Sequence, residues 1–319
     1  MTLTWPVVAA VLFGALLHAS WNALIKSGTD KSLDTALIHV MGCVVAIPLL
    51  LTVGLPPPAA WPWLAASLVI HIGYYIALAG AYKHGDLGFT YPIMRGLGPL
   101  LVALILGVSG GAIIDEKLSL ATILGVAGIS SGVLLVGLSH VSQGNAGPPQ
   151  VSLLPLGGTV AAKRRPWGHA DSDHRRALQY ALLNAAIIAV YTIVDGIGVR
   201  ASGNALQYVA LLFLLDGLPY FLLVMHRRGK AERPAAWAHM RKRWPLALLG
   251  TLASLGSYGI ALWAMTRAPV AAVAALRETS VLFAALLGTW LLKEPFGARR
   301  AAGTLCIASG VMAVRLAQA

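Results

Sequence analysis

Two arginines lie in long apolar stretches of this sequence, where a charge is costly. Arg95 and Arg277 both fall inside segments long enough to cross a bilayer. Placing Arg at the centre of a bilayer helix costs about 2.5–3.5 kcal/mol on insertion scales. A guanidinium does not escape this cost by losing its proton. Each arginine therefore requires a carboxylate partner, a water-filled cavity or an anionic ligand.

The sequence leaves two interpretations of Arg95 and Arg277 open. The functional one is recognition of an anionic group, because a guanidinium pairs bidentately with a carboxylate, phosphate or phosphonate. The structural one is a salt bridge with an acid of the same apolar stretches: Glu278, Asp216 or Asp195. Three intramembrane acids are enough to neutralise two arginines.

Acids and histidines in the apolar stretches are also candidates for proton coupling. A carboxyl group in a low-dielectric cavity can exchange a proton as the cavity opens alternately to each side. The candidates are Asp195, Glu278, Asp216, His18 and His71, with His39 as a further histidine. The alternative is charge compensation for the acids and hydrogen-bonded packing for the histidines. Asp216 is the weakest acid, because it lies mid-span and outside the expected cavity.

Aromatic and amide side chains near these charges are expected to line a substrate cavity by stacking or hydrogen bonding. They are Trp21, Asn22, Tyr75, Tyr91, Tyr191, Tyr258 and Trp263. Packing or anchoring at the membrane interface is the alternative for each aromatic residue. Trp5, Trp61 and Trp63 carry less functional weight, since they lie at segment ends.

Composition places the chain among membrane proteins that cross the bilayer several times. Of its 319 residues, 57% are hydrophobic and 11% are charged, whereas soluble proteins have about 25% charged residues. The net charge of +12 lies mainly in loops, which favours a membrane surface over nucleic acid as its partner. Cys43 and Cys306 lie far apart in apolar runs, so we expect buried thiols and no disulfide.

The spacing of the chain's polar residues excludes several other classes. No His, Cys, Asp and Glu residues in the sequence have the spacing of metal ligands, so neither a metal site nor a cofactor is expected. No Walker-type loop is present, so transport must be secondary. The first apolar run starts almost at Met1 without a basic region. It is predicted to be a membrane span and not a removable signal.

Ten segments approach the length of about 20 residues that a membrane helix needs. The predicted spans cover about 4–26, 33–54, 61–83, 88–109, 118–139, 177–199, 205–226, 244–266, 268–292 and 298–316. The fold class predicted is an all-α integral membrane protein with ten transmembrane helices. It is divided into a first five-helix repeat (1–139), a basic cytoplasmic linker (140–176) and a second five-helix repeat (177–319).

Lysine and arginine residues are distributed unequally over the two sides of these spans. One set of loops holds eighteen of them and the other holds four. The positive-inside rule assigns the richer set to the cytoplasm. Both termini are therefore predicted to face outward, in a bacterial-type inner (plasma) membrane.

An internal repeat relates the two halves of the chain. Residues 125–133 are similar to residues 303–311, and Arg95 corresponds to Arg277 at nearly the same offset. Because five spans is an odd number, two similar halves must be inserted in opposite orientations. This is an inverted-topology repeat, which is typical of secondary transporters with a site between the halves.

The segment around Arg95 differs from the corresponding segment around Arg277. Pro92, Gly96 and Pro99 have no counterparts in the second half. Proline removes a backbone donor and glycine adds conformational freedom. We therefore expect a loosened helix around Arg95 that moves more than the segment around Arg277.

With these features together, the chain resembles EamA-type members of the drug/metabolite transporter superfamily. The residues that carry the resemblance are Ser20-Trp21-Asn22, Arg95 through Pro99, Glu116, Glu294 and the glycine patterns of the fifth and tenth spans. The resemblance implies a 5+5 inverted repeat that moves small metabolites, often outward. It implies a cavity lined by spans one, three, four, six, eight and nine. Members of this family are commonly drawn with cytoplasmic termini, the opposite of the orientation that the charges predict here.

Two features near the fifth and tenth spans are given structural interpretations. Glu116 and Glu294 precede these spans, where a carboxylate interacts favourably with the N-terminal dipole of a helix. Rows of glycine and alanine within the same spans permit close helix packing. Homodimerisation through these rows is the alternative.

The predicted function is a secondary active transporter, an exporter by analogy and not an enzyme. The expected substrate is a small polar metabolite with an anionic or zwitterionic group, such as an amino-acid-like compound or organic acid. Expected partners are this substrate, the lipid bilayer and a proton as coupling ion, in a monomer or homodimer, with no nucleic acid. The alternatives are an exporter of cationic or hydrophobic drugs that uses Glu278 or Asp195, a membrane-embedded enzyme acting on a lipid-linked substrate, and a receptor without flux.

Overall fold

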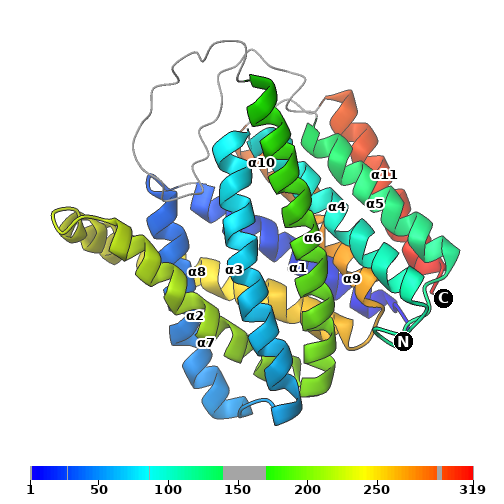
Figure 1. The fold of residues 1–319 in the computed structure, drawn as a ribbon, viewed down its shortest axis with the longest axis horizontal. Coiled ribbons are helices and arrows are strands. Elements are labelled where there is room, and N and C mark those ends of the chain that lie inside the picture. The colour runs from blue at the N-terminus through cyan, green and yellow to red at the C-terminus, as the bar shows by residue number, and fades with distance from the viewer. Residues whose placement is uncertain (1, 27, 86, 139–169, 293–296, 319) are drawn as a thin grey trace.

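A computed structural model describes residues 2–26, 28–85, 87–138, 170–292 and 297–318, which form an all-helical bundle (Figure 1). The helices are α1 (Trp5–Lys26), α2 (Lys31–Val53), the 3₁₀ turn η1 (Pro58–Ala60), α3 (Trp61–His84), α4 (Leu87–Ser109), α5 (Leu120–Leu138), α6 (Ala170–Ser202), α7 (Ala205–Arg227), α8 (Arg233–Met265), α9 (Val270–Arg277), α10 (Ser280–Leu292) and α11 (Ala298–Leu316).

Eight of the described helices, α1 to α8, are long and apolar enough to cross a membrane. The sequence predicted ten spans. The ninth and tenth of these are not among the eight, each for its own reason. The ninth predicted span is divided into α9 and α10, which have 8 and 13 residues. α11 has 19 residues but includes Arg299, Arg300 and Arg315. The described chain is thus a multi-span helical membrane protein with eight candidate spans.

The boundary between the predicted linker and the second half also differs. α6 begins at Ala170, so its first two turns occupy the end of the predicted linker (140–176). Residues 139–169 of that linker lie outside the described residues. α6 and α8 have 33 residues each, which is longer than the roughly 20 residues needed to cross a bilayer. Both helices therefore extend past the hydrocarbon region.

The helix around Arg95 is continuous, and its greater mobility stays a prediction. α4 runs from Leu87 to Ser109 through both of its prolines. Its glycines give room for neighbours: a Cβ on Gly96 would lie 2.8 Å from the Leu134 side chain of α5, and one on Gly98 would lie 2.9 Å from Ile188 of α6. The interruption lies instead in the second half, between α9 and α10.

The glycine rows of α5 and α11 pack against each other. These two helices lie side by side at one edge of the bundle (Figure 1). A Cβ on Gly132 would lie 2.6 Å from the carbonyl oxygen of Gly303, and one on Gly125 would lie 2.7 Å from the backbone nitrogen of Val314. Such close backbone approach requires glycine, so the rows serve packing within the chain.

The two termini lie on the same side of the bundle (Figure 1). The Arg315 guanidinium near the end of α11 lies 5.2 Å from the centre of the Trp5 ring at the start of α1. Nε2 of Gln318 donates to Oγ1 of Thr122 at 3.0 Å. The ends of α1 and α7 that lead to α2 and α8 lie on the opposite side of the bundle (Figure 1). The loops that follow them belong to the set that is rich in lysine and arginine.

Candidate functional site

Arg95 forms an ion pair with Glu278 between the two halves of the chain. Nε of Arg95, on α4, lies 2.9 Å from Oε2 of Glu278, at the interruption between α9 and α10. The two side chains are 11% and 6% exposed. The Arg95 guanidinium also lies 3.3 Å from Nε2 of His18 on α1. Arg95 thus has the carboxylate partner that an intramembrane arginine requires.

Arg277 has a different environment from Arg95. Its guanidinium carbon lies 5.0 Å from the centre of the Tyr258 ring of α8, in a cation–π contact. Among the described residues, no carboxylate oxygen lies within 4 Å of this guanidinium, which remains partly exposed. Both arginines are close enough to Glu278 to interact with it electrostatically. The structure therefore brings two positive charges and one negative charge together at this point.

Asp195 is held by tyrosine hydroxyls and not by an arginine. The side chain, on α6, is fully buried. Its Oδ1 accepts from Tyr208 of α7 at 2.9 Å, and its Oδ2 accepts from the hydroxyl of Tyr258. Tyr258 therefore contacts Asp195 with its hydroxyl and Arg277 with its ring face. This arrangement places a second acid near the arginines without a direct ion pair.

Asp216 lies apart from the arginines, between α2, α3 and α7. Its Oδ2 accepts from the Tyr75 hydroxyl at 3.2 Å, and Nδ1 of His39 lies 4.0 Å from the same oxygen. The structure thus assigns Tyr75, expected in the substrate cavity, to a second polar cluster. The prediction that Asp216 lies outside the central group agrees with this position.

The remaining predicted side chains are divided between the arginine cluster and other places. Tyr191 and Tyr91 lie near Arg95, and the Tyr191 ring stacks on His71 at 4.7 Å. Trp21 packs edge-on against His18 at 5.3 Å. Two residues point elsewhere: the Asn22 amide donates to the His18 carbonyl of its own helix at 2.7 Å, and Trp263 packs against Arg267 at 5.7 Å near the end of α8.

Glu116 has a role that the sequence analysis assigned wrongly. It does not interact with the start of α5, which begins at Leu120. The carboxylate accepts from the backbone N–H of Val270 at 3.1–3.2 Å, so it caps α9 of the other half. It also pairs with Arg200 of α6. Glu116 does lie at the N-terminus of a helix, as predicted, but that helix is α9 and not α5. Glu294 lies outside the described residues.

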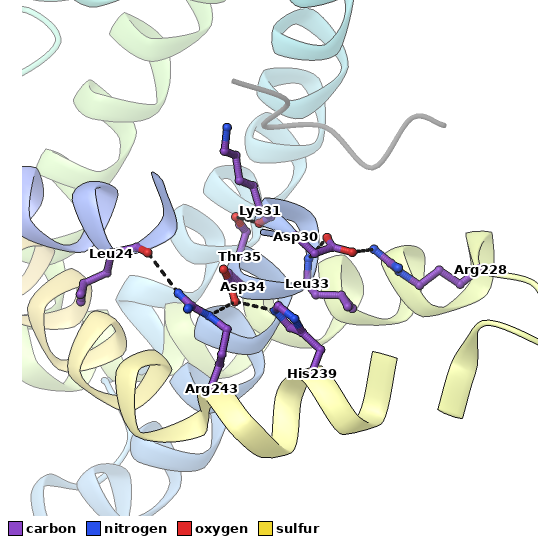
Figure 2. Close-up of polar contacts among 9 residues, drawn as sticks. All are labelled: Leu24, Asp30, Lys31, Leu33, Asp34, Thr35, Arg228, His239 and Arg243. Atoms are coloured by element: carbon purple, nitrogen blue, oxygen red, sulfur yellow. Dashed lines mark hydrogen bonds and ion pairs between the residues drawn. The ribbon is translucent and has the colours of Figure 1, made fainter. Parts of the chain in front are cut away.

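A cluster of charges that the sequence analysis missed joins the halves at the opposite face (Figure 2). Asp34 of α2 pairs with Arg243 at 2.7 Å and His239 at 2.9 Å, both on α8. Asp30 caps α2 and pairs with Arg228, after α7, at 2.7 Å. The sequence feature that could have indicated this cluster is an Asp at the start of a helix, on the same predicted side as a basic loop. Sequence alone does not indicate which basic residue pairs with which acid.

Part of the chain is similar to a known family of membrane proteins. Residues 175–316 match the EamA-like transporter family. This match begins within α6 and ends at the last residue of α11, so it gives an EamA-like domain over these residues. The predicted resemblance is confirmed for residues 175–316.

A solved crystal structure of another protein shares the fold over nearly the whole chain. The two sequences are 19% identical, and the alignment covers 97% of this chain and 98% of the other, with a TM-score of 0.67. Identity at this level shows a common fold and no more. Among curated protein sequences, none matches this chain.

Proposed function

We propose that this protein is a secondary active transporter of small metabolites that carry a carboxylate or another anionic group. The anionic group is bound by Arg277, and amino-acid-like and organic acids are the substrate classes that fit this chemistry. Transport proceeds by alternating access between the two five-helix halves, in the outward direction, with a proton as the coupling ion.

The observation that carries this proposal is the difference between the two arginines. Glu278 neutralises Arg95, whereas Arg277 has no carboxylate within 4 Å among the described residues and is partly exposed. A partly buried guanidinium in a membrane protein is costly when no carboxylate pairs with it. A substrate carboxylate would supply two parallel hydrogen bonds to it. Tyr258 supports this geometry by holding the guanidinium over its ring.

The same charges argue against a drug exporter that binds cations. Such a transporter needs an acid that is available to the substrate. Glu278 is already paired with Arg95, and Asp195 is fully buried and accepts two tyrosine hydroxyls. Both acids near the arginines therefore already have partners, whereas Arg277 has no carboxylate within 4 Å among the described residues, which favours an anionic or zwitterionic ligand.

The packing of helices across the bundle supports an inverted repeat. α2 packs against α7 and α5 against α11, and each of these pairs joins helices at corresponding positions in the two halves. α1 packs against α8, and α3 packs reciprocally against α6. A pseudo-two-fold axis between the halves would produce this pattern. The proposal places the basic linker in the cytoplasm of a bacterial-type cell and both termini outside.

Exchange across proteoliposomes tests the substrate proposal. Vesicles containing the protein are loaded with unlabelled amino acids, organic acids, phosphonates or sugar phosphates, and entry of the labelled compound is measured. We expect exchange of at least one anionic class. Arg277→Ala should reduce this exchange at least about tenfold, because a hydrogen bond to a charged group contributes roughly 1.5–3 kcal/mol.

Two further variants distinguish recognition from general damage. Arg277→Lys keeps the charge but loses the bidentate geometry, so it should also impair exchange. Arg267→Ala is the matched control, because this arginine packs on Trp263 near the end of α8. Unchanged exchange in folded Arg277→Ala and Arg95→Ala variants would refute the proposal.

A further inference from the structure

Four polar side chains meet between α2, α3 and α7, away from the arginines. The Tyr75 hydroxyl donates to Asp216 at 3.2 Å, and Nδ1 of His39 lies 4.0 Å from the same carboxylate oxygen. The Tyr220 ring lies 5.0 Å from the His39 ring and 5.9 Å from the Tyr75 ring. His39 and Tyr75 belong to the first half of the chain, and Asp216 and Tyr220 belong to the second.

Among the described residues, the Asp216 carboxylate has no Lys or Arg partner. In the part of the chain that the structure describes, no Lys or Arg nitrogen from α2, α3, α6 or α8 lies within 4 Å of this carboxylate, and His39 is its one basic neighbour. Other titratable groups nearby are Cys43 of α2 and His71 of α3. An ionised carboxylate is costly among membrane helices. A proton is therefore the charge that can neutralise this pair.

The distance between His39 and Asp216 is set by contact between helix backbones. A Cβ on Gly217 would lie 2.3 Å from the His39 carbonyl oxygen and 2.6 Å from Sγ of Cys43. The Cys43 thiol donates to the Leu214 carbonyl of α7 at 3.3 Å. α7 thus rests directly on α2 beside the pair, and any shift of one helix along the other changes the distance between the two groups.

We propose that His39, Asp216 and Tyr75 form a proton-binding site separate from the arginine cluster. One proton is bound either to Nδ1 of His39 or to Oδ2 of Asp216, and the pair is neutral in both arrangements. Its release breaks one N–H or O–H bond and leaves one negative charge on Asp216. The two side chains keep 23% and 25% of their surface exposed.

The site joins the two halves, which makes it suited to proton coupling. Movement of α2 against α7 would change the distance between His39 and Asp216, and with it the affinity for the proton. This coupling role rests on the proposed transport function. The proton site itself does not.

Infrared difference spectroscopy of the protein in lipid vesicles measures the protonated carboxyl group directly while the pH is stepped. We expect a carboxyl band that titrates and that is lost in Asp216→Asn. In His39→Gln the proton can reside only on Asp216, so the protonated carboxyl signal at neutral pH should grow. Tyr75→Phe removes a donor that favours the ionised form, so the signal should grow there as well.

Asp195→Asn is the matched control, because Asp195 is also a buried acid that accepts tyrosine hydroxyls. It should leave the band assigned to Asp216 in place. The inference would be overturned if that band persisted in Asp216→Asn. It would also be overturned if the intensity of the band were unchanged in both His39→Gln and Tyr75→Phe. The latter two variants keep the carboxylate, so they decide the question even where Asp216→Asn does not fold. Absence of anion exchange would refute the transporter proposal and leave the spectroscopic result standing.

Discussion

At the scale of single residues, the two corresponding arginines have different roles. Arg95 pairs with Glu278 and contacts His18, so three helical segments from both halves meet at one guanidinium. Arg277 instead lies on the Tyr258 ring. The sequence predicted either anion binding or a salt bridge for both arginines. The structure assigns the salt bridge to Arg95, and anion binding remains our proposal for Arg277.

The Arg95–Glu278 pair leads to a prediction about stability. Glu278→Ala should destabilise the protein by about 3–5 kcal/mol, because removing one partner of a buried pair leaves an uncompensated charge. Replacing both residues by methionine should recover much of this loss, since a well-packed apolar pair is often as stable as a buried ion pair. Thermal unfolding in detergent micelles measures both effects.

The exposed acid Asp115 provides the control for this experiment. Asp115→Ala should change the free energy of unfolding by less than about 0.5 kcal/mol, as is usual for surface substitutions. Equal unfolding temperatures for Glu278→Ala and the double methionine variant would contradict the prediction, because the cost would then not arise from the unpaired guanidinium of Arg95.

At the scale of helices, backbone contact explains sequence features that looked like flexibility. The glycines of α4 give room to side chains of α5 and α6, and those of α5 and α11 let two backbones touch. Such contacts offset part of the entropy that glycine loses on folding. The helix break lies at Glu278 instead, where the carboxylate meets Arg95.

The contact between α5 and α11 predicts a strong effect of a larger side chain. Gly132→Val should destabilise the protein by about 1–3 kcal/mol, because overpacking forces helices apart. Two of the three nearest atoms, the Gly303 carbonyl oxygen and the Ile307 nitrogen, are backbone atoms of α11, which cannot move aside easily. Gly229→Ala is the control: no atom lies within 4 Å of its added Cβ. Equal unfolding temperatures for the two variants would contradict the packing of these helices.

At the scale of the whole molecule, ion pairs join the two halves near both faces. Glu116 and Arg200 connect them on the side of the termini. Asp34 with Arg243 and His239 connects them on the opposite side (Figure 2). Alternating access requires that contacts at one face open while those at the other close. In the mechanism that we propose, these two clusters are the contacts that would break in turn.

The orientation of the molecule in the membrane can be tested by labelling. A cysteine at Gly229, in the turn before α8, should resist a membrane-impermeant maleimide in intact cells, because the positive-inside rule assigns this basic side to the cytoplasm. A cysteine at Lys117, an exposed residue before α5, should be labelled. The reverse pattern in intact cells would place both termini inside.

The sequence by itself determined the class of this protein. Apolar segments of membrane-spanning length need no tertiary information, because the bilayer requires each helix to satisfy its own backbone hydrogen bonds. The resemblance to EamA-type transporters, confirmed over residues 175–316, rested on local motifs and their order. The sequence also identified the central acids and arginines as candidate functional residues, because charged residues are rare in membrane-spanning segments.

Only the tertiary structure decided how those charges are partnered. Glu116 caps α9 at 154 positions along the chain, and Asp34 meets Arg243 across 209 positions. Sequence patterns report the period and polarity of one helix, whereas an ion pair depends on how two distant helices cross. The same limit separated Arg95, which the fold provides with a carboxylate, from Arg277, which among the described residues it leaves without one within 4 Å.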